Sequence, residues 1–347
     1  MERIGIVRDD IFLSHNPGAF HPESPDRLKA LYRMIEEAEM SDRVQTLGTR
    51  RAERDEITLV HTENHFERIA STAGLPQSYL DGDTQTSEHS FEAALCAAGA
   101  VLRSVDLLMS GEYKNPIFTL VGPPGHHAEA GRAMGFCLFN NIALGARYSI
   151  ERYGLKRVMI VDWDLHHGNG TQNTFYDDPN VLYFSTHQYP YYPGTGGLRE
   201  TGRGDGRGFT VNVPLAPGRG DADYLRIFHE ILKPIGEAYE PEMVLVSAGF
   251  DIHSSDPLGG MSVSPAGFAG LAAVVQDLAH RYAGDRLILT LEGGYHLGGL
   301  TDSVRSVIEQ LSTAAMPDTE MQGGDTATER VIEEVKEVHG KQWPLGG

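Results

Sequence analysis

Short, mostly apolar runs recur along the 347-residue chain, and longer segments with apolar residues at every third or fourth position lie between them. Short apolar runs bounded by polar residues are typical of buried strands. Strands are predicted at residues 4–7, 117–121, 157–161, 182–185, 209–213, 243–246 and 287–291.

The longer segments carry helix signals. Ser24 followed by Pro25 predicts a helix start, because serine caps a helix and proline fits its first turn. An apolar stripe with helical spacing runs from Phe91 to Leu108 and ends at Gly111. Further helices are predicted around 139–153, after Ser264-Pro265, and around 221–240, where Pro234 predicts a kink or break.

Strands that alternate with helices predict an α/β fold with a parallel sheet covered on both faces. We find no internal repeat and no long linker, so residues 1–313 are interpreted as one domain. Residues 314–347 are interpreted as a polar tail, in which residues 331–338 have the apolar spacing of one short helix.

The composition narrows the function. With 29 Lys and Arg against 48 Asp and Glu, the formal net charge is −19, which argues against binding to nucleic acid. Cys96 and Cys137 alone cannot form a disulfide framework. We see no unbroken apolar run of about 18 residues and no signal-peptide core at the start of the chain, so no membrane contact and a cytoplasmic location are expected.

Four predicted strands lead into loops rich in glycine and in side chains that can do chemistry. The loops read GPPGHH after 117–121, DWDLHHGNG after 157–161, SAGFD after 243–246 and EGGY after 287–291. Ligand sites of open parallel sheets form at the carboxyl ends of the strands. All four loops are therefore expected to meet at one edge.

Asp164 and His166 are two residues apart, so their side chains share one face of an extended segment. With Asp251 they offer two oxygens and one nitrogen, a set of three ligands that suits a catalytic zinc with an open fourth position. The two oxygens also suit Fe²⁺, Co²⁺ or Mn²⁺. A metal is thus predicted, and its identity stays open.

The other loop residues supply the remaining parts of a hydrolytic site. His126 and His127 could act as general base and acid, and Tyr295 could donate a hydrogen bond to an oxyanion. Asp162 and Asn169 could orient the histidines. The set indicates metal-assisted hydrolysis of an amide or ester.

Longer segments carry a resemblance to a known family. They are HPESPDRL, LVHTENHFERI, GPPGHHAEAGRAMGFCLFNN, VDWDLHHGNGTQ, YYPGTG, SAGFDIHSSDPLGG and LEGGYHLGGL, in that order within residues 4–310. Together they resemble the histone deacetylase superfamily, which includes bacterial class II deacetylase-like amidohydrolases and acetylpolyamine amidohydrolases. The resemblance implies the arginase–deacetylase fold, with a single open sheet of about eight parallel strands and helices on both faces.

The resemblance also implies roles for individual residues. It implies Zn²⁺, with Fe²⁺ or Co²⁺ as substitutes, on Asp164, His166 and Asp251. It implies His127 as general base and acid, His126 as its electrostatic partner, and Tyr295 on the substrate carbonyl. Asp162 and Asn169 match the residues that hydrogen-bond the two histidines, and Arg27 matches an arginine near an internal acetate channel.

Further matches concern the substrate tunnel, a structural ion and the rim. The implied tunnel residues are Gly135, Phe136, Tyr192, Leu258, Gly293 and Gly294, and the implied K⁺ site involves Asp162, Asp164, His166, Ser185 and Thr186. Leu258 lies where the polyamine-specific vertebrate enzyme has a glutamate, so polyamine specificity through that residue is not implied. Asp83 is a candidate rim contact for a cationic or peptide substrate.

The resulting hypothesis is a zinc-dependent amidohydrolase that removes acetyl from an N-acetylated amine, such as acetyl-lysine in a peptide or an acetylpolyamine. An arginase-like hydrolase with two Mn²⁺ is an alternative, although it would need more bridging carboxylates. A non-catalytic module that binds acyl-lysine or a partner is another. The sequence leaves the substrate and the oligomeric state open, a homodimer included.

Overall fold

The computed structural model describes residues 3–313 and 325–346. One open sheet has eight strands in the order β2-β1-β5-β10-β9-β6-β7-β8, and every neighbouring pair is parallel. The strands are β1 (Ile4–Val7), β2 (Val44–Leu47), β5 (Ile117–Thr119), β6 (Val158–Asp162), β7 (Val181–Gln188), β8 (Thr210–Leu215), β9 (Met243–Ala248) and β10 (Leu287–Leu291). The predicted α/β class and single parallel sheet are confirmed.

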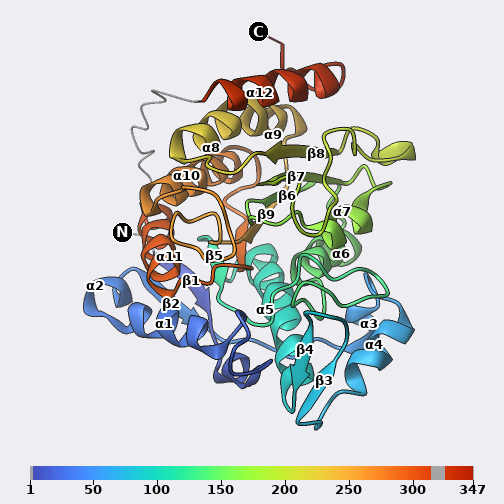
Figure 1. Cartoon of the computed structure of the whole chain (residues 1–347), viewed down its shortest axis with the longest axis vertical. Coiled ribbons are helices and arrows are strands. Elements are labelled where there is room, and N and C mark those ends of the chain that lie inside the picture. The colour runs from blue at the N-terminus through green and yellow to red at the C-terminus, as the bar shows by residue number, and fades with distance from the viewer. Residues whose placement is uncertain (1–2, 314–324, 347) are drawn as a thin grey trace.

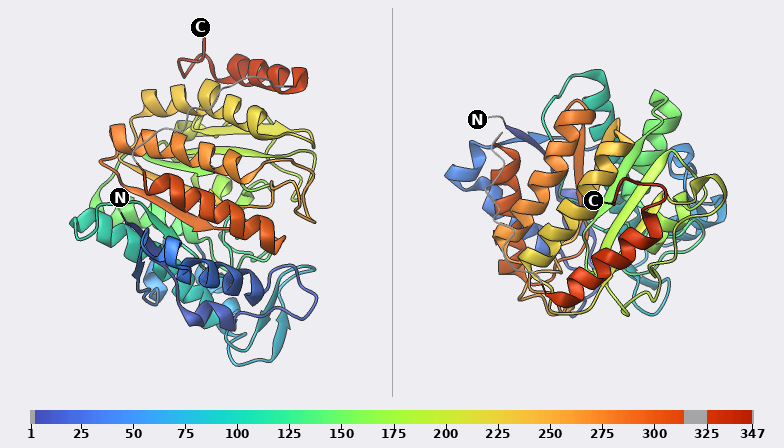
Figure 2. Two further views of the ribbon diagram at one scale, coloured as in Figure 1. Left: turned by 90° about the vertical axis from the view of Figure 1, so that its left-hand side faces the viewer. Right: turned by 90° about the horizontal axis from the view of Figure 1, so that it is seen from above.

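Helices cover both faces of the sheet (Figures 1 and 2). One layer holds α1 (Pro25–Glu36), α8 (Asp221–Ile227), α9 (Lys233–Tyr239), α10 (Pro265–Tyr282) and α11 (Leu297–Leu311). The other holds α5 (Ser90–Ser110), α6 (Asn141–Tyr153) and α7 (Asn169–Phe175). The short helices are α2 (Ala38–Ser41), α3 (Arg54–Ile57) and α4 (Glu63–Ala70), and α12 (Thr326–His339) packs against the edge strand β8.

Local sequence explains why these elements form. Every residue of β6 is buried, because helices lie on both sides of the central strands. Helix α1 starts at Pro25 after Ser24, as predicted. Helix α5 ends before Gly111, whose φ of 73° is a left-handed conformation that glycine adopts without strain. These signals confirm the element boundaries to within a few residues.

Helix α5 is long and apolar enough, by length and composition, to cross a membrane, and among the described residues it is alone in this. The helix contains no unbroken apolar run of about 18 residues, because small and polar residues interrupt its sequence. In the fold, 72% of its most apolar window is buried, as in the core helix of a globular domain.

Three features depart from the sequence pattern or refine it. Strand β2 was not predicted, since it is an edge strand and its two central residues are exposed. The hairpin of β3 (Gln77–Tyr79) and β4 (Gln85–Ser87) was also missed. The break expected near Pro234 is present as a π-helical turn, Phe228–Leu232, between α8 and α9.

Helix α12 covers the segment whose apolar spacing predicted one short helix, and it is longer than that segment. Ile332 and Val335 from α12, and Trp343 after it, pack into the main hydrophobic core. The predicted boundary between the domain and the tail falls beside residues 314–324, which lie outside the described residues.

The strand order decides where the site forms. Strands β5, β10, β9 and β6 are consecutive neighbours in the sheet and run in the same direction. Their carboxyl ends therefore lie at one edge, and the four loops singled out in the sequence follow these strands.

Candidate metal centre and catalytic pocket

Asp164, His166 and Asp251 form the group of described residues that could hold a metal ion. One ligand atom from each lies within 4.8 Å of the others. Nδ1 of His166 is 3.2 Å from Oδ1 of Asp164 and 3.0 Å from Oδ2 of Asp251. The structure thus brings together the three predicted ligands from two loops.

Backbone amides hold the two carboxylates in place. Oδ1 of Asp164 accepts from the amide of His166 at 2.8 Å, and its Oδ2 accepts from the amide of Gly293 at 2.9 Å. Oδ1 of Asp251 accepts from the amide of Leu165 at 2.8 Å. These bonds leave oxygens of both carboxylates facing the His166 imidazole, where a cation would bind.

The electrostatics of the three side chains fit a divalent cation. Burial raises the pKa of Asp251 to about 7, and the neighbouring Asp164 adds to this effect. Burial alone would lower the pKa of His166, but contacts with Asp164 and Asp251 outweigh it and raise that pKa to about 10. Among the described residues, the polar partners of the two carboxylates are backbone amides and imidazoles, with no lysine or arginine. A metal ion bound here would replace the proton on His166 and balance the two carboxylates.

The two histidines after β5 lie beside this group, with ring centroids 4.0 Å apart. Nδ1 of His126 is 3.1 Å from Oδ2 of Asp162, and its Nε2 is 3.8 Å from Oδ1 of Asp164. Burial lowers the pKa of His126, but the charges of Asp164, Asp162 and Glu292 outweigh it and raise the pKa to about 10. The carboxylates around His126 thus favour its protonated form.

His127 has the opposite character. Burial and the charges of His126 and His166 hold its pKa well below the ordinary value. Its Nδ1 lies 2.8 Å from Oδ1 of Asn169. The amide nitrogen of Asn169 donates to Glu129 at 2.5 Å, so the amide oxygen faces the ring and accepts a hydrogen bond from Nδ1–H. The neutral imidazole then has its free lone pair on Nε2, the tautomer of a general base.

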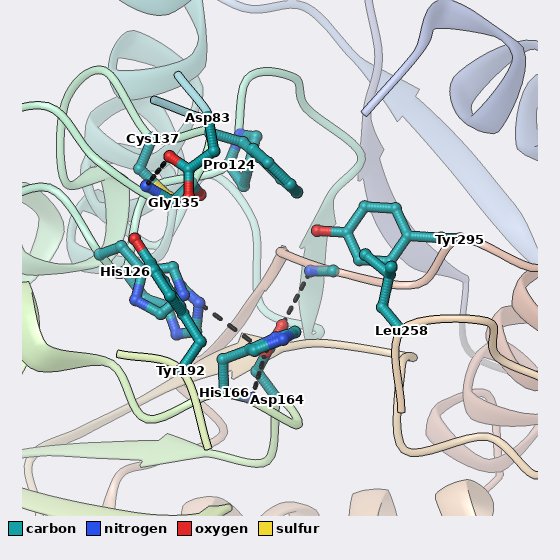
Figure 3. Close-up of a pocket in the computed structure, with 13 residues that line it drawn as sticks. Asp83, Pro124, His126, Gly135, Cys137, Asp164, His166, Tyr192, Leu258 and Tyr295 are labelled. Carbon is teal, nitrogen blue, oxygen red and sulfur yellow. Dashed lines mark hydrogen bonds and ion pairs between the residues drawn. The ribbon is translucent and has the colours of Figure 1, made fainter. Parts of the chain in front are cut away.

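A pocket of about 80 Å³ opens onto these groups (Figure 3). It is lined by Asp83, Pro124, His126, His127, Gly135, Phe136, Cys137, Asp164, His166, Tyr192, Leu258, Gly293 and Tyr295. The phenol of Tyr295 points into the pocket, opposite His126 and Tyr192. Burial raises the pKa of Tyr295 well above its ordinary value, so the hydroxyl keeps its proton as a donor.

Aromatic rings and glycines form the walls of this narrow pocket. The ring of Tyr192 lies edge to face against that of His127, with 5.1 Å between the ring centroids. The centroids of the Phe136 and Tyr295 rings are 5.9 Å apart. Phe136 has a φ of 69°, a costly backbone conformation for a residue other than glycine, and its side chain lines the pocket. A Cβ on Gly135 would lie 2.3 Å from the His127 ring, so glycine is required beside the base.

The remaining predicted residues take different places. Asp83 lines the pocket, and its Oδ1 accepts from the amide of Gly135 at 3.3 Å. Gly294 is outside the lining but has a φ of 117°, which lets the chain turn before Tyr295. Arg27 is buried, and its guanidinium lies 4.9 Å from the centroid of the Tyr295 ring.

The residues predicted to hold K⁺ come from the end of β6, the loop after it and the interior of β7, where Ser185 is in register with Asp162. The Ser185 hydroxyl lies 2.9 Å from Nδ1 of His187, and the Thr186 hydroxyl is buried without a hydrogen-bond partner among the described residues. The K⁺ site stays a prediction.

Sequence reasoning missed several contributors. Cys137 and Pro124 were not predicted as site residues, and both line the pocket. Glu23, which lies two residues before the start of α1, forms a buried ion pair with Arg27. Glu292 is fully buried next to the histidine loop, although the sequence marks it only as the first residue after a strand.

Comparisons with known proteins agree with this geometry. A sequence model of the histone deacetylase domain matches residues 21–311. A probable deacetylase of Archaeoglobus fulgidus is 35% identical, over 98% of each chain. Polyamine deacetylase HDAC10 of Homo sapiens is 38% identical, over 93% of this chain and 49% of that protein. The crystal structure of the HDA15 HD domain superposes with a TM-score of 0.92 at 37% identity, over 99% of this chain and 96% of that one.

The extent of these matches differs among relatives. The chain spans 52–59% of the length of three plant histone deacetylases that it also resembles.

Proposed function

The chain belongs to the histone deacetylase family, and on this premise we propose that it is a metal-dependent amidohydrolase that removes an acetyl group from an N-acetylated amine. The supporting observation is the convergence of three metal-ligating side chains with a neutral imidazole, a cationic imidazole and a phenol around one narrow pocket. We propose Zn²⁺ as the ion, with Fe²⁺ or Co²⁺ as substitutes, and a structural K⁺ near Asp162 and Ser185.

Each side chain has a task in this reaction. A cation held by Asp164, His166 and Asp251 would supply Lewis acidity toward the acetyl carbonyl and the attacking water. His127 accepts a proton from that water at Nε2 and then donates one to the leaving amine, so that water adds, the C–N bond breaks, and acetate and amine are released.

Three more groups contribute, one at the carbonyl oxygen and two at His127. Tyr295 donates a hydrogen bond to the carbonyl oxygen as negative charge develops on it. The positive charge of His126 keeps His127 neutral before it accepts the proton. Asn169 holds His127 in the required tautomer.

The pocket indicates the shape of the substrate. A volume of about 80 Å³ suits a small acyl group on an unbranched chain, and Phe136 and Tyr192 offer apolar surfaces to that chain. Acetyl-lysine in a peptide and an acetylated polyamine both have this shape. Asp83 at the pocket could bind a backbone amide or a second amine.

The test is a comparison of kcat/KM for acetyl-lysine peptides, acetylated polyamines and small acyl amides at fixed metal content. We expect turnover of at least one class, its loss after chelation, and its recovery with one Zn²⁺ per chain. Binding of all three classes without turnover under several metals would instead support a non-catalytic module. Activity that requires two Mn²⁺ per chain would support arginase-like chemistry.

A further inference from the structure

A buried carboxylate that takes part in no step of the proposed mechanism lies behind the histidine loop. Glu292 directly follows β10, and its side chain is fully buried. Strand β10 lies between β5 and β9 in the sheet. A side chain at its end can therefore reach both the loop after β5, which carries the histidine pair, and the end of β9.

The carboxylate of Glu292 makes both of these contacts. Its Oε2 accepts from the amides of Gly125 and His126, at 2.7 Å and 3.2 Å. Its Oε1 accepts from the hydroxyl of Ser247 on β9 at 3.0 Å. The Glu292 amide also donates to the carbonyl of Ala248 at 3.1 Å. Glu292 thus joins three strand ends around the site.

The two amides are the important partners. His126 is 3% exposed, so water cannot readily replace the carboxylate as the acceptor for its backbone amide. A buried donor left without an acceptor destabilises the structure, so the loop would move to find another partner. A small movement matters here, because His127 must keep its bond to Asn169 while its Nε2 faces the pocket.

The loop has further contacts, and they do not duplicate this one. Asn140 reaches the carbonyls of His126 and Ala128 at 3.4 and 3.3 Å, so it binds acceptors and leaves the two amides to Glu292. Asp162 and Asn169 bind the imidazole rings. Glu292 is thus the acceptor that the structure gives to the backbone immediately before the catalytic pair.

We propose that Glu292 is a positioning residue, whose carboxylate fixes the Gly125–His126 turn and so directs the two imidazoles toward the metal-binding group. The proposal rests on the proposed function, in which those imidazoles transfer protons. It requires the reach of the side chain and its acceptor oxygens, and it does not require the negative charge.

Two variants separate reach from charge. Glu292→Gln keeps the length and one acceptor oxygen for the amides, whereas Glu292→Asp keeps the charge but is one methylene too short. We expect Glu292→Asp to lower kcat by about 10–100-fold, the usual range for residues that orient site groups, with KM within about twofold. Glu292→Gln should retain kcat within about threefold, because its amide oxygen preserves the contact. Glu112→Asp and Glu112→Gln, on the surface, are matched controls.

Three results with these variants would overturn the positioning role of Glu292. Wild-type kcat in Glu292→Asp, or a larger loss in Glu292→Gln than in Glu292→Asp, would overturn the proposal. A fall in kcat, a rise in KM by the same factor and loss of bound metal would together also overturn the proposal. Glu292 would then support the whole site and not the histidine turn alone.

A readout without turnover separates this proposal from the proposed function. In protein labelled with ¹⁵N-histidine, imidazole resonances report on the two rings in the resting enzyme. Glu292→Asp should shift those of His126 and His127 and leave those of His61 and His65 in place. If the wild type does not deacetylate any substrate but these shifts occur, the proposed function fails and the positioning role stands. Unchanged ring signals in Glu292→Asp would refute the positioning role even if the wild type is active.

Discussion

Replacing Gly293 with alanine tests the metal centre by steric means alone. A Cβ at this position would lie 2.4 Å from Oδ2 of Asp251 and 2.8 Å from Oδ2 of Asp164. The backbone of Gly293 is outside the left-handed region, so alanine is compatible with its φ. The methyl group therefore affects the two carboxylates and not the local chain conformation.

The size of the effect follows from these distances. Carbon and oxygen in close contact are about 3.3 Å apart, so Oδ2 of Asp251 would have to withdraw by about 0.9 Å. Metal–ligand distances tolerate deviations of about 0.2 Å. The carboxylate cannot rotate freely, because its other oxygen is bound to the Leu165 amide. We expect metal affinity to fall by at least about 10–100-fold, and turnover with it.

The assay measures bound metal by mass spectrometry across a titration, with kcat at each metal concentration. Gly48→Ala is the matched control, because nothing lies within 4 Å of a Cβ there. Wild-type metal affinity and kcat in Gly293→Ala would show that the carboxylates do not bind the ion in the arrangement described.

The other predictions concern the acid–base groups and the stability of the fold. Tyr295→Phe should lower kcat by about 10²–10³-fold, the typical loss for an oxyanion donor, with metal retained. His127→Ala should lower kcat by about 10²–10⁴-fold. Steady-state kinetics combined with metal analysis checks both variants. Full turnover in either variant would refute the role assigned to that residue. Burial lowers the pKa of His339 to about 4 in the folded chain, from 6.5. Its contribution to stability is therefore present above pH 6.5 and is lost as pH falls toward 4, by up to about 3 kcal/mol. Urea unfolding of wild type and His339→Leu between pH 8 and 5 measures this, and an unchanged slope in the variant would contradict it.

The fold was readable from the sequence where burial was continuous. The apolar run that forms β6 is buried at every position, and its shortness and β-branched residues favour a strand. Strand β2 failed this test because Gln45 and Thr46 are exposed between buried Val44 and Leu47. An edge strand in which only the first and last residues are buried shows neither an apolar run nor a clear alternation of apolar and polar residues. Only its pairing with β1 reveals it.

The site was readable where chemistry was concentrated in one loop. Asp164 and His166 attract notice because several such groups rarely follow a buried strand without a ligand. Glu292 gave no such signal, since a single carboxylate after a strand is ordinary. Its importance depends on β10 lying between β5 and β9, and this order is set by tertiary packing. Cys137 was not predicted as a pocket residue for a related reason, because a buried residue can contact the core and the pocket together.

Anomalous diffraction from crystals of the purified protein, measured on both sides of the zinc absorption edge, tests the central claim most directly. The account predicts one strong peak between Asp164, Nδ1 of His166 and Asp251, about 2.0–2.2 Å from each ligand atom. A pair of peaks in that place, or no peak there in active protein, would contradict it.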